Sequence, residues 1–492
     1  MSACDPLRAA TGIEGLDDVL GGGFPAGRLY LLEGEPGSGK TMLALQFLVE
    51  GAARGERVLY VPLLETAQEL HGIARAHGWS LEGVSIQELA NEETTGADGH
   101  YTVFHPSEIE LTETIRAVFE AVERIQPARV VVDSLSEMRL LARDPLRYKR
   151  QVLGLKRDFA GRGCTVLLLD GLTSRSAGLQ MASLVHGLVR LEHLATEYGA
   201  ERRRLRVLKL RGVPFRGGYH DFRIRTGGLT VYPRLVAAEH QNGFERELVT
   251  SGVSELDTLA GGGLYRGTST LVMGPAGCGK SLLGVQYAVA AARRGERAVI
   301  YVFDESPGTL LASADGIGTG LGEQVMAGRV LLRQIDPAQF SPGEFACEAR
   351  RAVERDGARV LVLDSLNGYL GAMPQERFLI AHLHELLSYL RQRGVLVVLV
   401  MAQHGLFGSA LDRGVDLSYL ADAVIVLRYF EAAGVIRRAI SMTKKRGGGH
   451  EPTIRELRID GSGLHVGPPV GDVQGVLSGT PVYTGASTPR TA

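Results

Sequence analysis

The stretch that decides the fold reads GEPGSGKT and consists of Gly34, Glu35, Pro36, Gly37, Ser38, Gly39, Lys40 and Thr41. It follows an apolar run, RLYLLEG at 28–34, and precedes TMLALQFLVEGAARG at 41–55, whose apolar residues have helical spacing. A glycine loop between a strand and a helix turns successive backbone N–H groups toward one point, and the helix N-terminus adds positive dipole there. The stretch therefore predicts a phosphate-binding loop.

The same pattern occurs 240 residues later as GPAGCGKS, which consists of Gly274, Pro275, Ala276, Gly277, Cys278, Gly279, Lys280 and Ser281. Other pairs recur in the same order: GIEGLD at 12–17 with GVSELD at 252–257, RVVVDSL at 129–135 with RVLVLDSL at 359–366, and KLRG at 209–212 with KKRG at 444–447. A repeat of this length indicates two copies of one domain. We expect these domains at 1–240 and 241–468, followed by a flexible tail at 469–492 that is rich in Gly, Pro, Ser and Thr.

Each copy alternates apolar runs with helical patterns. In the first copy we expect strands at 28–34, 57–64, 130–133 and 164–170, and helices at 41–55, near 108–125 and near 146–160. Strands that are apolar throughout and separated by helices are typical of a parallel sheet covered on both faces. Each copy then ends in β-rich sequence, at about 205–232 and 423–466. The expected fold class is α/β, with two tandem phosphate-loop NTPase domains of mostly parallel sheet flanked by helices.

Composition narrows the functional classes. The chain has 492 residues and a formal net charge of −1, so bulk charge gives no argument for a nucleic-acid or membrane partner. Its four cysteines are widely separated, which favours a reducing cytoplasm over a disulfide scaffold. The first residues lack the pattern of a signal peptide. The apolar stretch VLVVLVMA, residues 395–402, is far shorter than the roughly 20 residues of a membrane span.

The loop residues and two strand-ending acids predict a site for ATP and Mg²⁺. Lys40 and Lys280 are expected to reach the β- and γ-phosphates, while the hydroxyls of Thr41 and Ser281 bind Mg²⁺. Asp133 and Asp364 end apolar strands downstream of each loop, where a carboxylate orients the shell of the ion. A strand-ending aspartate is by itself often a turn residue. Its recurrence in both copies favours the metal-site interpretation.

Hydrolysis or phosphoryl transfer also needs a base. Glu65 follows one strand, and Asp304 and Glu305 follow its counterpart, where strand ends face the nucleotide edge of a parallel sheet. Two basic pairs, Lys209 with Arg211 and Lys444 with Arg446, lie on strand-like segments late in each copy. Spacing leaves two interpretations open for them, a solvated charged edge or a finger inserted into the nucleotide site of a neighbouring subunit.

Taken together, these elements resemble the RecA-like ATPases and, among them, the KaiC family of circadian clock proteins. The resemblance covers roughly residues 10–480 and rests on the doubled motifs, with LLET and FDES at the base positions and KLRG and KKRG late in each copy. It implies two stacked rings in a homohexamer with ATP between subunits. It also implies that Lys209, Arg211, Lys444 and Arg446 act on the neighbour's γ-phosphate, and that Glu65 and Glu305 activate the attacking hydroxyl or water.

The chain departs from the family pattern at several positions. The first copy has Leu64-Glu65 where the family has two acids, and the second has Asp304-Glu305. The family's phosphorylated Ser-Thr pair corresponds to Ser418-Tyr419, so Ser418 is a candidate phosphosite within a broken pair. The tail lacks a clear match to the family's partner-binding segment, so regulatory protein partners stay unidentified.

The second copy also has an aspartate, Asp422, where the first copy has His186. The two rings are therefore not chemically equivalent.

Three functions are compatible with these features. The first is an ATP-hydrolysing, hexameric signalling switch with serine autokinase activity in the second copy. The second is a RecA- or helicase-like motor on DNA, for which ERRRLRVLKLRG at 201–212 would be a basic stripe. The near-neutral charge and the absence of a zinc-finger pattern make a nucleic-acid partner the weaker alternative. The third is a scaffold that binds ATP only to assemble.

Overall fold

The computed structural model describes residues 7–88, 106–142, 144–171, 181–195, 199–240, 243–371, 378–403, 418–432, 434–471, 473–476 and 482–483. The chain forms two compact units, Met1–Arg234 and Leu235–Ala492. The sequence repeat predicts a boundary after residue 240. Residues 235–240 instead pack with the second unit, because Leu235 and Ala237 are buried in its core and the Ala237 N–H donates to the carboxylate of Glu385.

The first unit contains β1 (Arg8–Ala9), α1 (Leu16–Leu20), β2 (Phe24–Pro25), β3 (Leu29–Gly34), α2 (Lys40–Ala53), β4 (Val58–Pro62), α3 (Ala67–Ala76), β5 (Val84–Ile86), α4 (Pro106–Ile125), β6 (Arg129–Asp133), α5 (Leu135–Ala142), α6 (Pro145–Arg162), β7 (Thr165–Gly171), β8 (Gly187–Leu194), β9 (Arg202–Leu210), β10 (His220–Arg225) and β11 (Gly228–Tyr232). Its large sheet has the order β11-β10-β9-β8-β3-β7-β6-β4-β5. The strands from β8 to β5 in this order are parallel, whereas β9, β10 and β11 are antiparallel.

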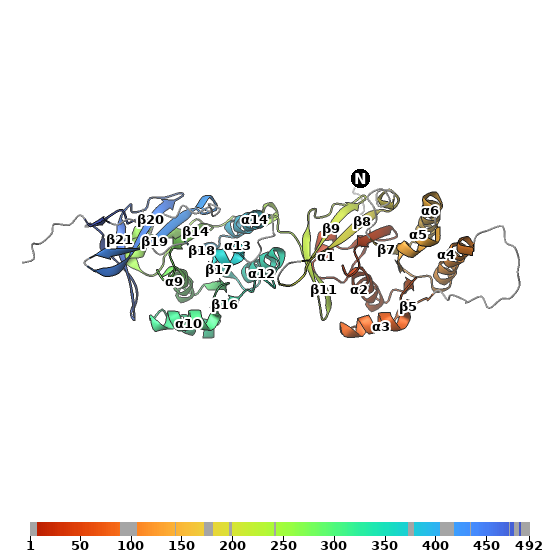
Figure 1. Cartoon of the computed structure of the whole chain (residues 1–492), viewed down its shortest axis with the longest axis horizontal. Helices are drawn as coiled ribbons and strands as arrows, with labels where there is room; N and C mark the ends of the chain where they lie inside the picture. The colour runs from red at the N-terminus through yellow and green to blue at the C-terminus, as the bar shows by residue number, and fades with distance from the viewer. Residues whose placement is uncertain are drawn as a thin grey trace, which may run out of the picture. The chain divides into compact units, whose positions relative to one another are not determined.

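Helices cover both faces of this sheet (Figure 1). Alternate residues of β3 point to opposite faces, as the pleat of a strand requires. Tyr30 and Leu32 pack in one apolar cluster with α2 and α3, while Leu29 and Leu31 pack in another with α4, α5 and α6. This burial on both sides explains why the central strands are apolar throughout.

The second unit contains η1 (Ala237–His240), β12 (Leu248–Val249), α8 (Ser254–Leu259), β13 (Leu264–Tyr265), β14 (Ser269–Gly274), α9 (Lys280–Arg293), β15 (Arg297–Val302), α10 (Pro307–Gly316), α11 (Leu321–Met326), β16 (Val330–Gln334), α12 (Pro342–Glu354), β17 (Ala358–Asp364), α13 (Leu366–Gly371), α14 (Leu379–Gln392), β18 (Leu396–Ala402), η2 (Ser418–Leu420), β19 (Ala423–Ala432), β20 (Val435–Lys445), β21 (Ile454–Asp460), β22 (Gly463–Pro469), β23 (Val473–Gln474) and β24 (Val482–Tyr483). Its sheet order, β16-β15-β17-β18-β14-β19-β20-β21-β22, repeats that of the first unit strand for strand.

The expected α/β class, with a mostly parallel sheet in each of two tandem copies, is confirmed. The strand β8 was not among the expected strands, and it pairs in parallel with β3 on one side and antiparallel with β9 on the other. Arg190 and Glu192 interrupt its apolar pattern, which hides it from a search for apolar runs. None of the described helices combines the length and the apolarity that crossing a membrane requires.

The tail beyond residue 469 has local structure in its described part. Strands β23 and β24 pair with each other in antiparallel fashion. Val476 is buried and packs with Phe430 and Ala439 of β19 and β20. At least this part of the tail therefore contributes to the apolar packing of the second unit.

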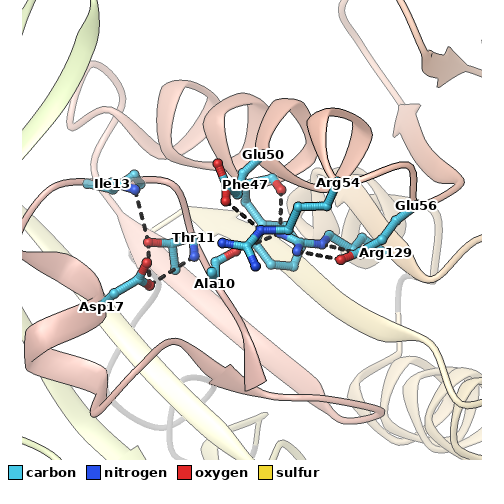
Figure 2. A network of polar contacts seen from close by, with 9 residues as sticks. All are labelled: Ala10, Thr11, Ile13, Asp17, Phe47, Glu50, Arg54, Glu56 and Arg129. Carbon is cyan, nitrogen blue, oxygen red and sulfur yellow. Dashed lines mark hydrogen bonds and ion pairs between the residues drawn. The ribbon is translucent and has the colours of Figure 1, made fainter. Parts of the chain in front are cut away.

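A buried arginine ties four segments of the first unit together (Figure 2). The Arg129 guanidinium is only 1% exposed and forms a bidentate ion pair with Glu56, at 2.6 and 2.8 Å. Its Nη1 also donates to the carbonyl oxygens of Ala10 (2.6 Å) and Phe47 (2.8 Å). The network thus joins the N-terminal segment, α2, the loop before β4 and the start of β6. The register places Val360 at the equivalent position of the second unit.

Replacing Arg129 by alanine should destabilise the first unit by about 3 kcal/mol, because Glu56 loses its partner and two carbonyls lose donors. The chain has a single tryptophan, Trp79, and it lies in the first unit. Its fluorescence during urea unfolding therefore reports on this unit alone. The control is Arg54→Ala, which removes an exposed ion pair between Arg54, directly after α2, and Glu50 of that helix. Equal shifts of the unfolding midpoint in the two variants would contradict the structural role of Arg129.

Candidate nucleotide sites

Each phosphate loop connects a central strand to a helix at the carboxyl end of the parallel strands. In the first unit β3 ends at Gly34 and α2 begins at Lys40, after Gly39 in a left-handed conformation with φ 100°. The backbone angle disfavours any residue with a side chain, and a Cβ on Gly39 would also lie 2.8 Å from Cδ1 of Ile224 in β10, which would have to shift. Because Gly39 cannot cap α2, the first N–H groups of the helix are left for an anion.

The second loop repeats this geometry. Here β14 ends at Gly274 and α9 begins at Lys280, after Gly279 with φ 104°. A Cβ on Gly279 would overlap Cδ1 of Ile459 in β21. In both units the antiparallel end of the sheet therefore packs directly against the loop that the sequence predicts for phosphate.

The loop lysines bond to carbonyl oxygens of their own loops. The Lys40 Nζ donates to Gly34 (2.8 Å) and Glu35 (3.0 Å), and the Lys280 Nζ donates to Pro275 (2.7 Å). Burial lowers the pKa of Lys40, while the nearby charge of Asp133 opposes this effect. Both ammonium groups thus lie at the rim of the loop, where phosphate oxygens could replace the carbonyls as partners.

The residue before the last loop glycine differs between the units. Ser38 is buried in the first, and Cys278 is buried in the second. Burial raises the pKa of the Cys278 thiol, which keeps it protonated and unreactive. The side chain at this position therefore fills space beneath the loop.

Asp133 of the first unit accepts two hydrogen bonds on one oxygen. The Thr41 hydroxyl donates to Asp133 Oδ2 at 3.1 Å, and the Tyr60 hydroxyl donates to the same atom at 2.6 Å. Burial raises the pKa of Asp133, and these two hydrogen bonds oppose the rise because they favour the carboxylate. The threonine hydroxyl keeps its lone pairs, so Thr41 and Asp133 form the oxygen-only donor set that suits Mg²⁺.

The carboxylate of Asp364 in the second unit has fewer hydrogen-bond donors among the described residues than that of Asp133. Ser281 forms a hydrogen bond with its carboxylate, and burial raises the pKa of the group. Its Oδ2 is buried and has no hydrogen-bond partner among the described residues. A buried carboxylate oxygen without a donor is costly, and water molecules on a bound cation would supply donors. The residues present at this site therefore fit Mg²⁺.

The predicted bases lie next to these aspartates. Strand β4 pairs with β6 so that Pro62 is opposite Asp133, and β15 pairs with β17 in the same way. Burial, followed by the charge of Asp133, raises the pKa of Glu65. Burial, followed by the charge of Asp364, raises the pKa of Glu305. A carboxylate with a raised pKa is a better proton acceptor.

Asp304 differs from its neighbour. Its side chain accepts a hydrogen bond from the Ser365 hydroxyl, directly after Asp364. In the first unit Leu64 occupies the equivalent position and is 66% exposed. The hydrogen bond from Ser365 thus holds the side chain of Asp304 at the end of β17. Of the two acids in the second unit, Glu305 is therefore the better candidate for the catalytic base.

The two basic pairs do not lie at the phosphate loop of their own unit. Lys209 pairs with Leu188 near the start of β8, whereas the phosphate loop begins at Gly34, which pairs with Leu191 farther along β8. Arg211 lies beyond Lys209, and both side chains donate to backbone carbonyls just before β8. Spacing in the sequence could not locate these cations.

Lys444 and Arg446 occupy the equivalent place in the second unit. The Lys444 Nζ donates to the carbonyl oxygen of Ser418 at 2.8 Å. Arg446 is 3.8 Å from the carboxylate of Asp422, and its side chain is 56% exposed. Ser418 therefore lies beside the basic pair and at the opposite end of the parallel strands from the loop of its own unit.

The contrast between Asp422 and His186 has a structural basis. Asp422 accepts hydrogen bonds from the Ser269 backbone (3.1 Å) and from Arg391, at 2.7 Å to both of its oxygens. In the first unit the Leu29 N–H donates to Nδ1 of His186 at 3.2 Å. Burial lowers the pKa of His186, so at neutral pH the ring is an uncharged acceptor. At this position the second unit thus places a carboxylate next to Arg446, whereas the first unit has an uncharged histidine ring.

Sequence reasoning missed Tyr60 and Asp170. Asp170 is the penultimate residue of β7, where it is 2% exposed and accepts hydrogen bonds from Ser136 (2.9 Å) and Arg139. Its charge also acts on Lys40. A comparison of the two copies could have pointed to these residues. The aligned strands of the second copy have Ile300 in place of Tyr60 and Met401 in place of Asp170.

Comparison with known proteins places this architecture in one family. The family model for the KaiC ATPase matches residues 9–236 and 249–471. The circadian clock protein KaiC3 of Synechocystis sp. is 30% identical, with 97% of this chain and 95% of that protein covered. The circadian clock oscillator protein KaiC of Acaryochloris marina is 26% identical, with 96% and 90% covered. With both copies matched in full, the chain belongs to the KaiC family of ATPases with tandem nucleotide-binding domains.

Proposed function

We propose that both units bind ATP with Mg²⁺ and hydrolyse it. The observation that carries this proposal is the repetition of one constellation at the carboxyl ends of both sheets. Each contains a glycine loop, a loop lysine, a hydroxyl hydrogen-bonded to a buried aspartate, and a glutamate of raised pKa. This set supplies groups that hold the phosphates, hold the divalent cation and activate the attacking oxygen in a phosphoryl transfer.

Each group has a separate role in this mechanism. The loop N–H groups and the lysine hold the phosphates, and Thr41 with Asp133, or Ser281 with Asp364, holds the ion. Bound Mg²⁺ would offset charge on the β- and γ-phosphates. Glu65 and Glu305 orient water and accept its proton as the oxygen attacks the γ-phosphorus, and ADP leaves with the electrons of the broken P–O bond.

We further propose that the chain assembles as a homohexamer in which the late cations act on a neighbour. Lys209, Arg211, Lys444 and Arg446 lie away from the loop of their own unit, which supports action in trans. The exposure of Arg446 also supports this interpretation. An arginine supplied from outside the site stabilises the charge that develops on the transferred phosphoryl group.

For the second unit we also propose serine autokinase activity, with Ser418 as the residue that accepts the phosphate. Ser418 begins η2, whose carbonyl oxygens are held by Lys444, by Arg446 and by the Ser269 hydroxyl. The same side chains that would reach a neighbour's nucleotide thus position this segment. In the reaction, Ser418 Oγ bonds to the γ-phosphorus, ADP leaves, and Glu305 of the neighbouring subunit takes the hydroxyl proton.

The DNA motor is the weaker alternative. Two arginines of β9 form ion pairs, Arg203 with Glu201 just before the strand and Arg204 with Glu192 of β8, both at 2.7 Å. Neutralised side chains offer less to a phosphate backbone than the sequence of this stripe suggests. The presence of Glu65 and Glu305 beside the loops argues against a purely structural scaffold.

We propose that the protein acts in the cytoplasm as a signalling switch, together with regulatory protein partners that are not identified. The relatives are named circadian clock proteins. Cys164, Cys278 and Cys347 are free thiols, which suits a reducing compartment.

Lys40→Ala and Lys280→Ala should each remove nucleotide binding from one unit and leave the other intact, because each ammonium serves a separate loop. Equilibrium binding of radiolabelled ATP should show half the wild-type stoichiometry for each variant and almost none for the double variant. Lys149→Ala, on α6, is the matched control and should bind normally. Loss of both sites from either single change would refute two independent sites.

Arg446→Ala, made in the Lys40→Ala chain, should lower ATP hydrolysis by the second unit on the order of 100-fold while ATP still binds. The physical reason is the loss of a cation that stabilises transition-state charge. Phosphate release and nucleotide binding are measured on the same samples. Arg458→Ala, an exposed arginine of β21, is the control. Unchanged turnover in Arg446→Ala would rule out the action in trans.

Incubation with ATP labelled in its γ-phosphate, followed by peptide mapping, should label Ser418. The label should disappear in Ser418→Ala and in Lys280→Ala, since the second unit supplies the nucleotide. Hydrolysis with no label on Ser418 would refute the autokinase and leave a plain ATPase.

A further inference from the structure

The two units differ in the side chain that the neighbouring strand places beside the metal-site aspartate, Asp133 or Asp364. Strands β4 and β15 have the same register against β6 and β17, so Tyr60 and Ile300 occupy equivalent positions. Both side chains are fully buried. Tyr60 donates its hydroxyl to Asp133 Oδ2 at 2.6 Å, whereas an isoleucine has nothing to donate.

The Tyr60 hydroxyl limits the freedom of the Asp133 carboxylate. Thr41 donates to the same oxygen from α2, so Asp133 is held from two elements at once. Burial raises the pKa of the Tyr60 phenol well above 10, which keeps it a neutral donor at physiological pH. The equivalent oxygen in the second unit, Asp364 Oδ2, is buried and lacks such a partner among the residues that the structure describes.

A packing role alone does not account for the hydroxyl of Tyr60. Its ring fills the apolar cluster beneath α2, and a phenylalanine ring would fill almost the same volume. The second unit buries the hydroxyls of Tyr287 and Tyr301 with no hydrogen-bond partner in the described chain. A buried tyrosine in this protein thus does not always find an acceptor, and the contact between Tyr60 and Asp133 calls for an explanation of its own.

We propose that Tyr60 is a positioning residue that holds the Asp133 carboxylate in place for the divalent cation of the first nucleotide site, a support that the second site lacks. The inference rests on the proposed binding of ATP with Mg²⁺. Groups that orient a metal ligand typically change metal affinity by 10–100-fold when they are removed. Tyr60 therefore sets how much Mg²⁺ the first site needs, without touching the nucleotide.

The test is Tyr60→Phe in the Lys280→Ala chain, where only the first site binds nucleotide. Binding of a fluorescent ATP analogue is followed while Mg²⁺ is titrated, at one fixed analogue concentration so that complex formation in solution is the same for every variant. The half-saturating Mg²⁺ concentration should rise about tenfold. The affinity for the analogue in EDTA should stay within about twofold, since the loop and Lys40 are unchanged.

Two controls separate positioning from folding. Tyr30→Phe removes another buried hydroxyl of the same unit, one that donates to the Pro25 carbonyl, and should leave the Mg²⁺ dependence unchanged. In a chain that already contains Asp133→Asn, adding Tyr60→Phe should cause no further shift, because the two residues act through one contact. Trp79 fluorescence verifies that each variant is folded.

An unchanged half-saturating Mg²⁺ concentration in Tyr60→Phe would overturn the inference. So would a loss of analogue affinity that is equally large in EDTA, which would indicate general damage to the site. A Lys280→Ala chain that binds no analogue with or without Mg²⁺ would overturn the proposed function itself, and the inference with it.

Discussion

The turn from a central strand into the following helix is the constraint on which each unit depends. Gly39 and Gly279 adopt φ near +100°, a conformation that other residues rarely take. Ile224 or Ile459 occupies the space that a side chain there would need. The backbone angle therefore favours glycine at this turn, and the antiparallel end of the sheet packs closely against it. This fit leaves the helix N–H groups open to the phosphates of a nucleotide.

The same scaffold supports two sites that differ in their supporting residues. The loop lysine, the hydroxyl and the aspartate are common to both units. The first two begin α2 or α9, and the aspartate ends β6 or β17, which have the same register against their neighbouring strands. One difference lies on the strand next to this aspartate, where the first unit has Tyr60 and the second has Ile300. A second difference is His186 against Asp422 near the late cations. Duplication has thus preserved the groups that would touch nucleotide while the residues that orient them diverged.

Most of the fold could be predicted from the sequence, because buried parallel strands are continuous apolar runs and glycine loops have a fixed spacing. The strand β8 escaped because Arg190 and Glu192 break its apolar pattern. The candidate site could be proposed from the sequence where a motif carries the chemistry, as at Lys40 and Asp133. Tyr60 was not, because its role depends on a cross-strand contact that no local pattern encodes. The buried Arg129 escaped for the same reason, since its partners come from three distant segments.

The charge around the first loop supports the proposal that further cations come from outside the unit. Lys40 interacts with Asp133, Asp170 and Glu65, so acids already outnumber the lysine. Arg139 forms an ion pair with one of these acids, Asp170. A triphosphate adds further negative charge to a partly desolvated site, where repulsion is weakly screened. A divalent cation and basic side chains brought from outside the unit would balance this charge. The late cations are directed away from their own loop, so a neighbouring copy of the chain is the arrangement that would supply them.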